Sequence, residues 1–311
     1  MGKYIVTAGQ NIYDVAMHLY GAPEGLLDLF INNPSLSYSK ELPIGDELTY
    51  TDEFVVNKDI VSYNKIHNII PANGERHIYF KEIRDVLLEA YIPKQKNSAS
   101  LVFSGEGVLT IDWGDNTDLE NVVLDRSVKE AHHFFNSNLS GNRKIRLCGE
   151  AKFQYLELSK LEAVEIYLLQ PLYTEKFTLQ HTDVNVEFIK LLENCYQIDL
   201  TGIETKSLLP LLRLKGLMRL KLDDTHIKPS VIDEYLIELV KQYGDRRSCH
   251  VSLTISPTGV YEEPLKDTNG NYIFASGMEA IWVILHEPAW NEGGNWKFII
   301  NGKTYTYEQD D

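Results

Sequence analysis

The sequence predicts a multidomain α+β protein, and three observations lead to that prediction. The first fifty residues read as strand, helix, helix, strand; the middle of the chain has the period-two alternation of short β-strands; and leucines recur later at a fixed interval. We expect a small βααβ domain at 1–56, a connector at 57–75, a β-sandwich at 76–149, an irregular repeat segment at 150–256 and a C-terminal β-hairpin cap at 257–311.

The N-terminal segment shows a local signal for each element. KYIVT at 3–7 alternates like a strand, and Asn11 is suited to cap a helix because its side chain accepts hydrogen bonds from free backbone amides. Asn33-Pro34 ends the second helix, since proline disfavours helical geometry in the residue before it, and ELTYT closes the module as a strand. Two apolar faces at helical spacing lie between these signals: Ile12, Val15, Ala16 and Leu19, then Leu26, Leu27, Phe30 and Ile31.

The motifs GQNIYDVA, HLYG, EGLLDLFINNPSL and LPIGDELTY resemble a LysM domain. They resemble still more closely the small tail protein X family of contractile phage tails, in which YG, NP and LP-x-G occur in this order. The resemblance covers residues 3–52 and implies a compact module that docks onto other molecules.

The carbohydrate-facing groove of the LysM family maps onto Gly9, Gln10, Asn11, Ile12, Asn33, Pro34 and Leu36. Typical LysM modules have GDTL where this chain has Gly9-Gln10-Asn11-Ile12. We therefore favour protein docking for this module. Glycan binding and an inert structural cap are the alternatives.

The middle of the chain predicts strands at HIYFKEI (77–83), VLLEAYI, ASLVF and GVLTIDW. The turn DWGDN at 112–116, answered by His133 and Phe135, resembles the PKD-like sandwich domains with their W-x-x-GDGT turn and later H-x-Y. A variant of that module often precedes leucine-rich segments in surface proteins of gut bacteria. The resemblance implies a β-sandwich.

The acidic residues of this turn raise the question of a metal site. Asp112, Asp115 and Asp118 do not have the spacing of a calcium loop, and no glutamate stands at its twelfth position. We interpret them as turn residues, with Asn116 tolerating left-handed geometry, and His133 as a packed sandwich residue. We expect no metal ion.

A repeat follows the sandwich segment. Leu158, Leu179, Leu200 and Leu222 are separated by steps of 21, 21 and 22 residues, and the segment resembles a short leucine-rich repeat. VIDEYLIELVKQYG at 231–244 predicts a helix and CHVSLTI a further strand. Stacked repeats share one exposed sheet face, which suits protein or glycan binding. The outward candidates on that face are Glu157, Thr178, Asp199 and Lys221.

The C-terminal segment predicts a hairpin, because Asn301-Gly302 lies between two alternating runs. Three tryptophans lie before this hairpin or at its start, and we expect them to fill a small cap over the last repeat: Trp282, Trp290 and Trp296. An aromatic binding surface is the alternative.

Composition restricts the partners. The net charge is −15, from 45 acidic and 30 basic residues, which disfavours nucleic acid or an anionic membrane. Cys148, Cys195 and Cys249 lie far apart, as expected of reduced core thiols. No apolar run is long enough to span a bilayer, and no secretory signal precedes the folded pattern, so we expect synthesis in the cytoplasm.

The sequence carries no phosphate loop, nucleophile elbow, HExxH motif or dinucleotide fingerprint, so we expect neither enzymatic activity nor a cofactor. The preferred hypothesis is a structural or interaction protein of a prophage tail or baseplate, with protein partners. The alternative is a cell-envelope protein that binds peptidoglycan through its first domain and a ligand through its repeats. Scaffolding within the cytoplasm is a third interpretation.

Overall fold

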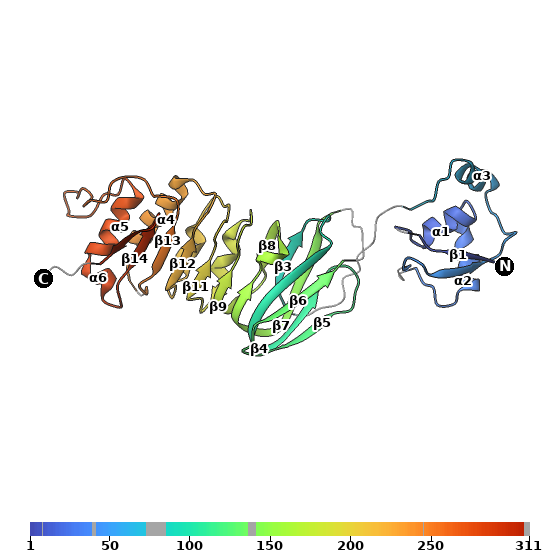
Figure 1. Ribbon diagram of the computed structural model, residues 1–311, viewed down its shortest axis with the longest axis horizontal. Helices are drawn as coiled ribbons and strands as arrows, with labels where there is room; N and C mark the ends of the chain where they lie inside the picture. The colour runs from blue at the N-terminus through green and yellow to red at the C-terminus, as the bar shows by residue number, and fades with distance from the viewer. Residues whose placement is uncertain (8, 39–41, 73–84, 136–140, 245, 308–311) are drawn as a thin grey trace. The chain divides into compact units, whose positions relative to one another are not determined.

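The computed structural model describes residues 1–7, 9–38, 42–72, 85–135, 141–244 and 246–307 (Figure 1). The expected strand at 77–83 lies outside these ranges. The described residues fall into two compact units, one up to residue 72 and one made of 85–135 and 142–307. The chain is a mixed α/β protein with one large sheet and few helices, as expected in coarse outline.

The N-terminal unit has the predicted element order. Strand β1 (Gly2–Ile5) pairs antiparallel with β2 (Glu47–Tyr50). Between them lie α1 (Ile12–Leu19), the short 3-10 helix η1 (Pro23–Gly25) and α2 (Leu26–Asn32). The predicted cap is confirmed, because the Asn11 side chain accepts hydrogen bonds from the amides of Tyr13 and Asp14 at 2.9 and 3.0 Å.

A further helix, α3 (Lys58–Ile66), lies where we expected only a connector, and it begins after the capping residue Asn57. Its pattern is hard to recognise because only Asn64 of the helix is buried. The segment belongs to the N-terminal unit: the carbonyl of Tyr20 accepts the amide of Asn57 at 2.9 Å, and the Gln10 amide donates to the carbonyl of Pro71 at 3.0 Å.

The first part of the larger unit is built from antiparallel strands. The long strand β4 pairs with β5, β6 and β7, while β7 also pairs with β3, and β3 with β8. Their bounds are β3 Val86–Ile92, β4 Ser98–Asp112, β5 Glu120–Leu124, β6 Lys129–Phe134, β7 Arg143–Glu157 and β8 Glu165–Leu168.

The expected boundary between sandwich and repeats, at 149/150, falls inside β7. The first half of β7 pairs with β3, and its last residues pair in parallel with β9. Within the described ranges, all strands from β3 onward are therefore hydrogen-bonded into one 13-stranded sheet. Backbone pairing does not separate the two segments, because a single extended strand serves both.

The repeat segment is a row of parallel strands in chain order. After β7 come β9 (Leu172–Thr178), β11 (Gln197–Asp199), β12 (Arg219–Leu222), β13 (His250–Leu253) and β14 (Lys297–Ile300). The short β10 (Leu192–Glu193) pairs with β9, and β15 (Lys303–Thr306) returns antiparallel to β14. The predicted hairpin is confirmed, with Asn301 and Gly302 at φ of 48° and 78°.

The four phased leucines lie in register inside the unit. Leu158, Leu179, Leu200 and Leu222 are at most 1% exposed. The amides of Leu158, Leu179 and Leu200 donate to the carbonyls of Thr178, Asp199 and Lys221 at 3.0, 2.9 and 2.9 Å. A second buried row runs parallel to them: Leu156, Phe177, Ile198, Leu220, Val251 and Phe298.

The connections between the parallel strands carry helices whose apolar sides join the same core (Figure 1). These are η2 (Ser159–Leu161), η3 (Val186–Leu191), η4 (Leu209–Arg213), α4 (Pro229–Lys241), α5 (Gly277–His286) and α6 (Pro288–Asn291). Helix α4 confirms the helix expected at 231–244. Trp290 and Trp296 are buried in the C-terminal part, as expected of a cap, whereas Trp282 is half-buried. Within the described ranges, every helix is too short or too polar to traverse a bilayer.

Candidate functional site

The predicted groove residues of the N-terminal unit lie at the entry to α1 and after the end of α2. Gly9, Gln10, Asn11 and Ile12 form the first group, and Asn33, Pro34 and Leu36 the second. Ile12 is 3% exposed and belongs to the core, Leu36 packs against that core, and Pro34 is exposed. Among the described residues, no hydrogen bond joins the two groups.

The polar members of both groups hold the unit together. The Gln10 carbonyl oxygen accepts hydrogen bonds from the Tyr4 hydroxyl at 2.8 Å and from the Thr7 amide at 2.9 Å. The Asn33 amide nitrogen donates to the carbonyls of Leu29 and Thr49, at 2.9 and 2.8 Å, and its oxygen accepts the Thr49 amide at 2.9 Å. Asn33 therefore joins the end of α2 to β2.

Asn33→Ala is expected to lower the stability of the N-terminal unit by about 2 kcal/mol, because the amide and the carbonyl of Thr49 lose their partner, whereas the Leu29 carbonyl keeps the backbone amide of residue 33. Residues 1–72 contain no tryptophan, so amide hydrogen exchange at Thr49 and its neighbours on β2 is the suitable measurement. Pro34→Ala changes an exposed neighbour and is the matched control. Unchanged protection of β2 in the Asn33 variant would contradict this role.

The DWGDN turn is a closed structural cluster. The Asp115 carboxylate accepts a hydrogen bond from His133 Nε2 at 2.7 Å, and Trp113 stacks on His133 with ring centroids 5.0 Å apart. Asp112 forms an ion pair with Arg146 at 2.7 Å. Asn116 has a φ of 66°, as its left-handed turn position requires. The prediction that His133 is a satisfied packed residue is confirmed.

The cysteines are buried free thiols, as predicted. Burial raises the pKa of Cys148 to about 11, and burial likewise raises the pKa of Cys195 and of Cys249 to about 12. A thiol with so high a pKa is a poor nucleophile at neutral pH. In the part of the chain that the structure describes, no group of three or more His, Cys, Asp and Glu side chains is placed to hold a metal ion.

The outward residues of the repeat segment form one row across the sheet. Glu157, Thr178, Asp199 and Lys221 stand opposite one another, and the row continues through Ser252 and Ile299. Lys221 is exposed and Glu157 is half-buried, but Thr178 and Asp199 are each only 9% exposed. The expectation that all four are accessible is therefore wrong for these two.

The physical reason is clearest at Asp199. Its carboxylate turns back to accept the amide and the hydroxyl of Thr201, at 3.1 and 2.6 Å, and it lies 3.3 Å from the Lys221 ammonium. Burial alone would raise the pKa of Asp199, but the hydrogen bonds from Thr201 and Gln180 and the charge of Lys221 together outweigh it, and the pKa is lowered. Asp199 is a charged part of the sheet surface that is already hydrogen-bonded within the chain.

A second outer row was missed in the sequence. Tyr155, Lys176, Gln197, Arg219, His250 and Lys297 are paired in register, two residues before the first row on each strand. Lys176, Arg219 and His250 are exposed, and Lys297 is half-buried. The signal was present, since side chains two residues apart on a strand share a face. We call these two rows together, the row that begins at Tyr155 and the row that begins at Glu157, the outer face.

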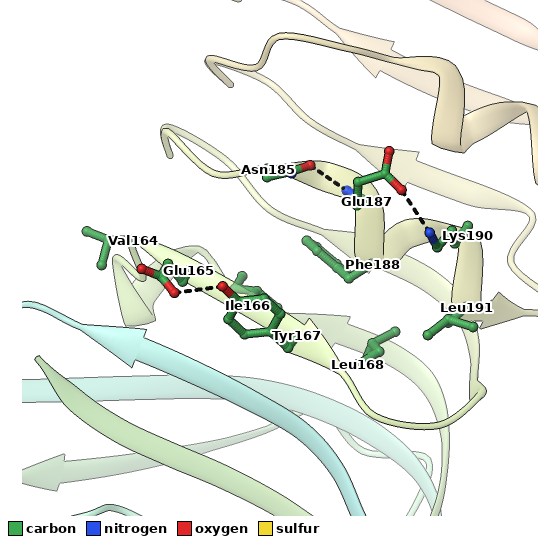
Figure 2. A pocket seen from close by; sticks show the side chains of 10 residues that line it. All are labelled: Val164, Glu165, Ile166, Tyr167, Leu168, Asn185, Glu187, Phe188, Lys190 and Leu191. Atoms are coloured by element: carbon green, nitrogen blue, oxygen red, sulfur yellow. Dashed lines mark hydrogen bonds and ion pairs between the residues drawn. The ribbon is translucent and has the colours of Figure 1, made fainter.

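A small hollow lies between β8 and η3 (Figure 2). It has a volume of about 270 Å³, with Ile166, Phe188 and Leu191 among its apolar lining residues. Its charged groups are paired with neighbours: the Tyr167 hydroxyl donates to Glu165 at 2.8 Å, and Lys190 contacts Glu187 at 2.9 Å (Figure 2). These pairs stabilise the rim and do not form an acid, base and nucleophile arrangement.

A wider and more polar hollow adjoins it at the ends of β7 and β9. Its volume is about 690 Å³, and its lining includes Ser159, Gln180, His181 and Asp183. The Ser159 hydroxyl accepts the Gln180 amide at 2.9 Å, so this serine is used in joining successive repeats. Both hollows belong to the first turns of the repeat segment.

Comparison of the chain with protein-family models, with curated proteins and with solved structures found no match. Function is therefore inferred from the arrangement of this chain's own residues. The outer face is the most extended feature of that arrangement.

Proposed function

We propose that this protein is a non-enzymatic interaction protein with two binding parts. The outer face of the parallel strands binds a protein partner, and the N-terminal unit docks the chain onto other subunits. The observation that carries the proposal is the register of six parallel strands, β7, β9, β11, β12, β13 and β14. They align two polar rows on one side, while the opposite side is buried beneath helices. An extended, aligned sheet face suits macromolecular binding.

The proposal includes the finer identity of the parts. Strand, helix, helix, strand order within residues 2–50 supports a LysM-like, tail protein X-like module. Parallel pairing at steps of 21 or 22 residues supports a leucine-rich repeat, and the Trp113–His133 stack supports a PKD-like turn. The N-terminal module favours a component of a prophage tail or baseplate, and the PKD-like turn followed by repeats is what supports the cell-envelope alternative.

Photo-crosslinking tests the proposed face. A benzophenone amino acid is placed in the full chain at Gln197 or Ser252 on the outer face, and at exposed Glu234 on α4 as the matched control. With purified tail-like particles, we expect a discrete crosslinked partner from the two outer-face positions and none from Glu234. Equal crosslinking from all three positions, or none from any, would contradict the proposal.

Sedimentation with purified peptidoglycan separates the two docking alternatives. Protein docking predicts that the full chain stays in the supernatant. Saturable sedimentation of the full chain would instead favour the cell-envelope interpretation of the N-terminal unit. A chain carrying Pro34→Asp, a change at an exposed groove position, shows whether such binding uses the predicted groove.

A further inference from the structure

Charge is distributed unevenly over the outer face. Carboxylates lie on its first strands, at Glu157 of β7 and Asp199 of β11, beside the exposed Lys176 of β9. Basic side chains gather on its last strands. Arg219, His250 and Lys297 stand directly opposite one another on β12, β13 and β14, and Lys215 and Arg247 lie on the segments that lead into β12 and β13. We call these five residues the basic cluster.

The basic cluster is compact. Neighbouring strands are about 4.8 Å apart, so the backbone positions of Arg219 and Lys297 are separated by roughly 10 Å. The two leading segments are joined, because the amide of Arg247 donates to the carbonyl of Lys215 at 2.9 Å. All five positions are therefore held by backbone pairing at the same end of three adjacent strands.

The cations of this cluster have no anionic partner within the described residues. No ion pair there involves Lys215, Arg219, Arg247 or Lys297, whereas Lys221 beside them is paired with Asp199. Like charges facing one another across strands destabilise a sheet. Cations that lie so close together, with no carboxylate partner in the described ranges, are notable in a chain with a net charge of −15.

We propose that the basic cluster binds an acidic polypeptide segment of the partner, an inference that rests on the proposed function of the outer face. Arginine and lysine bind carboxylates through charge-assisted hydrogen bonds, and arginine does so with two at once. Complementary charge at an interface also accelerates encounter and excludes wrong partners.

A polypeptide fits this face better than a uniform polyanion. A polymer with a negative charge on every unit, laid across the strands, would meet Asp199 and Glu157 after leaving the basic cluster. A polypeptide can place its carboxylates over β12–β14 alone and present neutral groups to Gln197 and Tyr155. The strongly negative net charge of the chain acts in the same direction by repelling long polyanions.

The test uses the full chain and a fluorescently labelled peptide with three consecutive glutamates flanked by neutral residues, called the triglutamate peptide, with binding followed by anisotropy at physiological ionic strength. The test variant is Arg219→Gln with Lys297→Gln. The matched control is Arg213→Gln with Lys228→Gln, which removes the same two residue types from exposed positions on η4 and at the start of α4. We expect the test variant to bind at least about tenfold more weakly, and the control to stay within about twofold of the parent chain.

Equal weakening in both variants would overturn the proposal, because only net charge would then matter. Failure of the parent chain to bind the triglutamate peptide would overturn it too, and so would equally tight binding of trigalacturonate, which would indicate an acidic saccharide. Crosslinking at Gln197 and Ser252 distinguishes a failure of the acidic-segment proposal from a failure of the proposed function. If crosslinking persists without binding of the triglutamate peptide, the outer face still binds a partner, and only the acidic chemistry is wrong.

Discussion

Leu200→Ala is expected to lower the free energy of unfolding of the larger unit by about 3–5 kcal/mol. Leu200 is fully buried between the equivalent Leu179 and Leu222, and its amide is bonded to the next strand. The cavity left by alanine cannot close easily, because hydrogen bonds on both sides hold the strands at a fixed spacing. A loss in one repeat also weakens its contacts with both neighbours.

Urea unfolding followed by tryptophan fluorescence measures this effect. All four tryptophans of the chain lie in the larger unit, so the N-terminal unit does not contribute to the signal. Lys221→Ala, on the exposed side of the adjacent strand, is the control and is expected to change stability by no more than about 0.5 kcal/mol. Similar losses in both variants would show that the phased leucines do not carry the core.

Asp115→Asn is the second substitution with a large expected effect, a loss of about 2–3 kcal/mol at pH 7. The Asp115 side chain is only 1% exposed. Its carboxylate is 2.7 Å from the His133 Nε2 and accepts the Thr117 hydroxyl at 2.6 Å. The Asp115 charge also favours the protonated form of the completely buried Arg143, whose pKa burial lowers. Asparagine keeps the shape but removes the charge.

The same substitution is expected to flatten the acid dependence of stability. Burial raises the pKa of Asp115, but hydrogen bonds from Thr117 and His133 outweigh it, so the folded pKa is below the ordinary value. The folded carboxyl then binds a proton less readily than the unfolded one. Its stabilising contribution is complete above the ordinary pKa of about 4 and is lost as the pH falls through the lower, folded pKa.

Urea midpoints of the parent chain and the variant between neutral pH and about pH 3 test this sign. Asp224→Asn is the matched control, since it removes one charge from an exposed turn and asparagine accepts the φ of 50° found there. We expect the control to follow the acid profile of the parent chain. An Asp115 variant with the parent's acid profile would show that this carboxyl does not link protonation to folding.

Several features of this protein were determined by the sequence alone, because their causes are local. Asn11 caps α1 through its own side chain, and Asn301-Gly302 adopts the positive φ angles that its hairpin requires. The leucine steps predicted which side chains share the interior, since a regular period keeps residues on one face of successive strands. The same period predicted that Glu157, Thr178, Asp199 and Lys221 would stand in one row.

Other features depend on contacts between residues distant in the sequence, and only the tertiary structure decided them. The sequence did not show that Gln10 would hydrogen-bond to Pro71 and Asn33 to Thr49. It also did not show that β7 would join the sandwich and repeat segments in one sheet. The basic cluster belongs to the same class. Periodicity determines which way a side chain faces, but the hydrogen-bonded register of parallel strands determines its neighbours, and that register placed Arg219, His250 and Lys297 side by side.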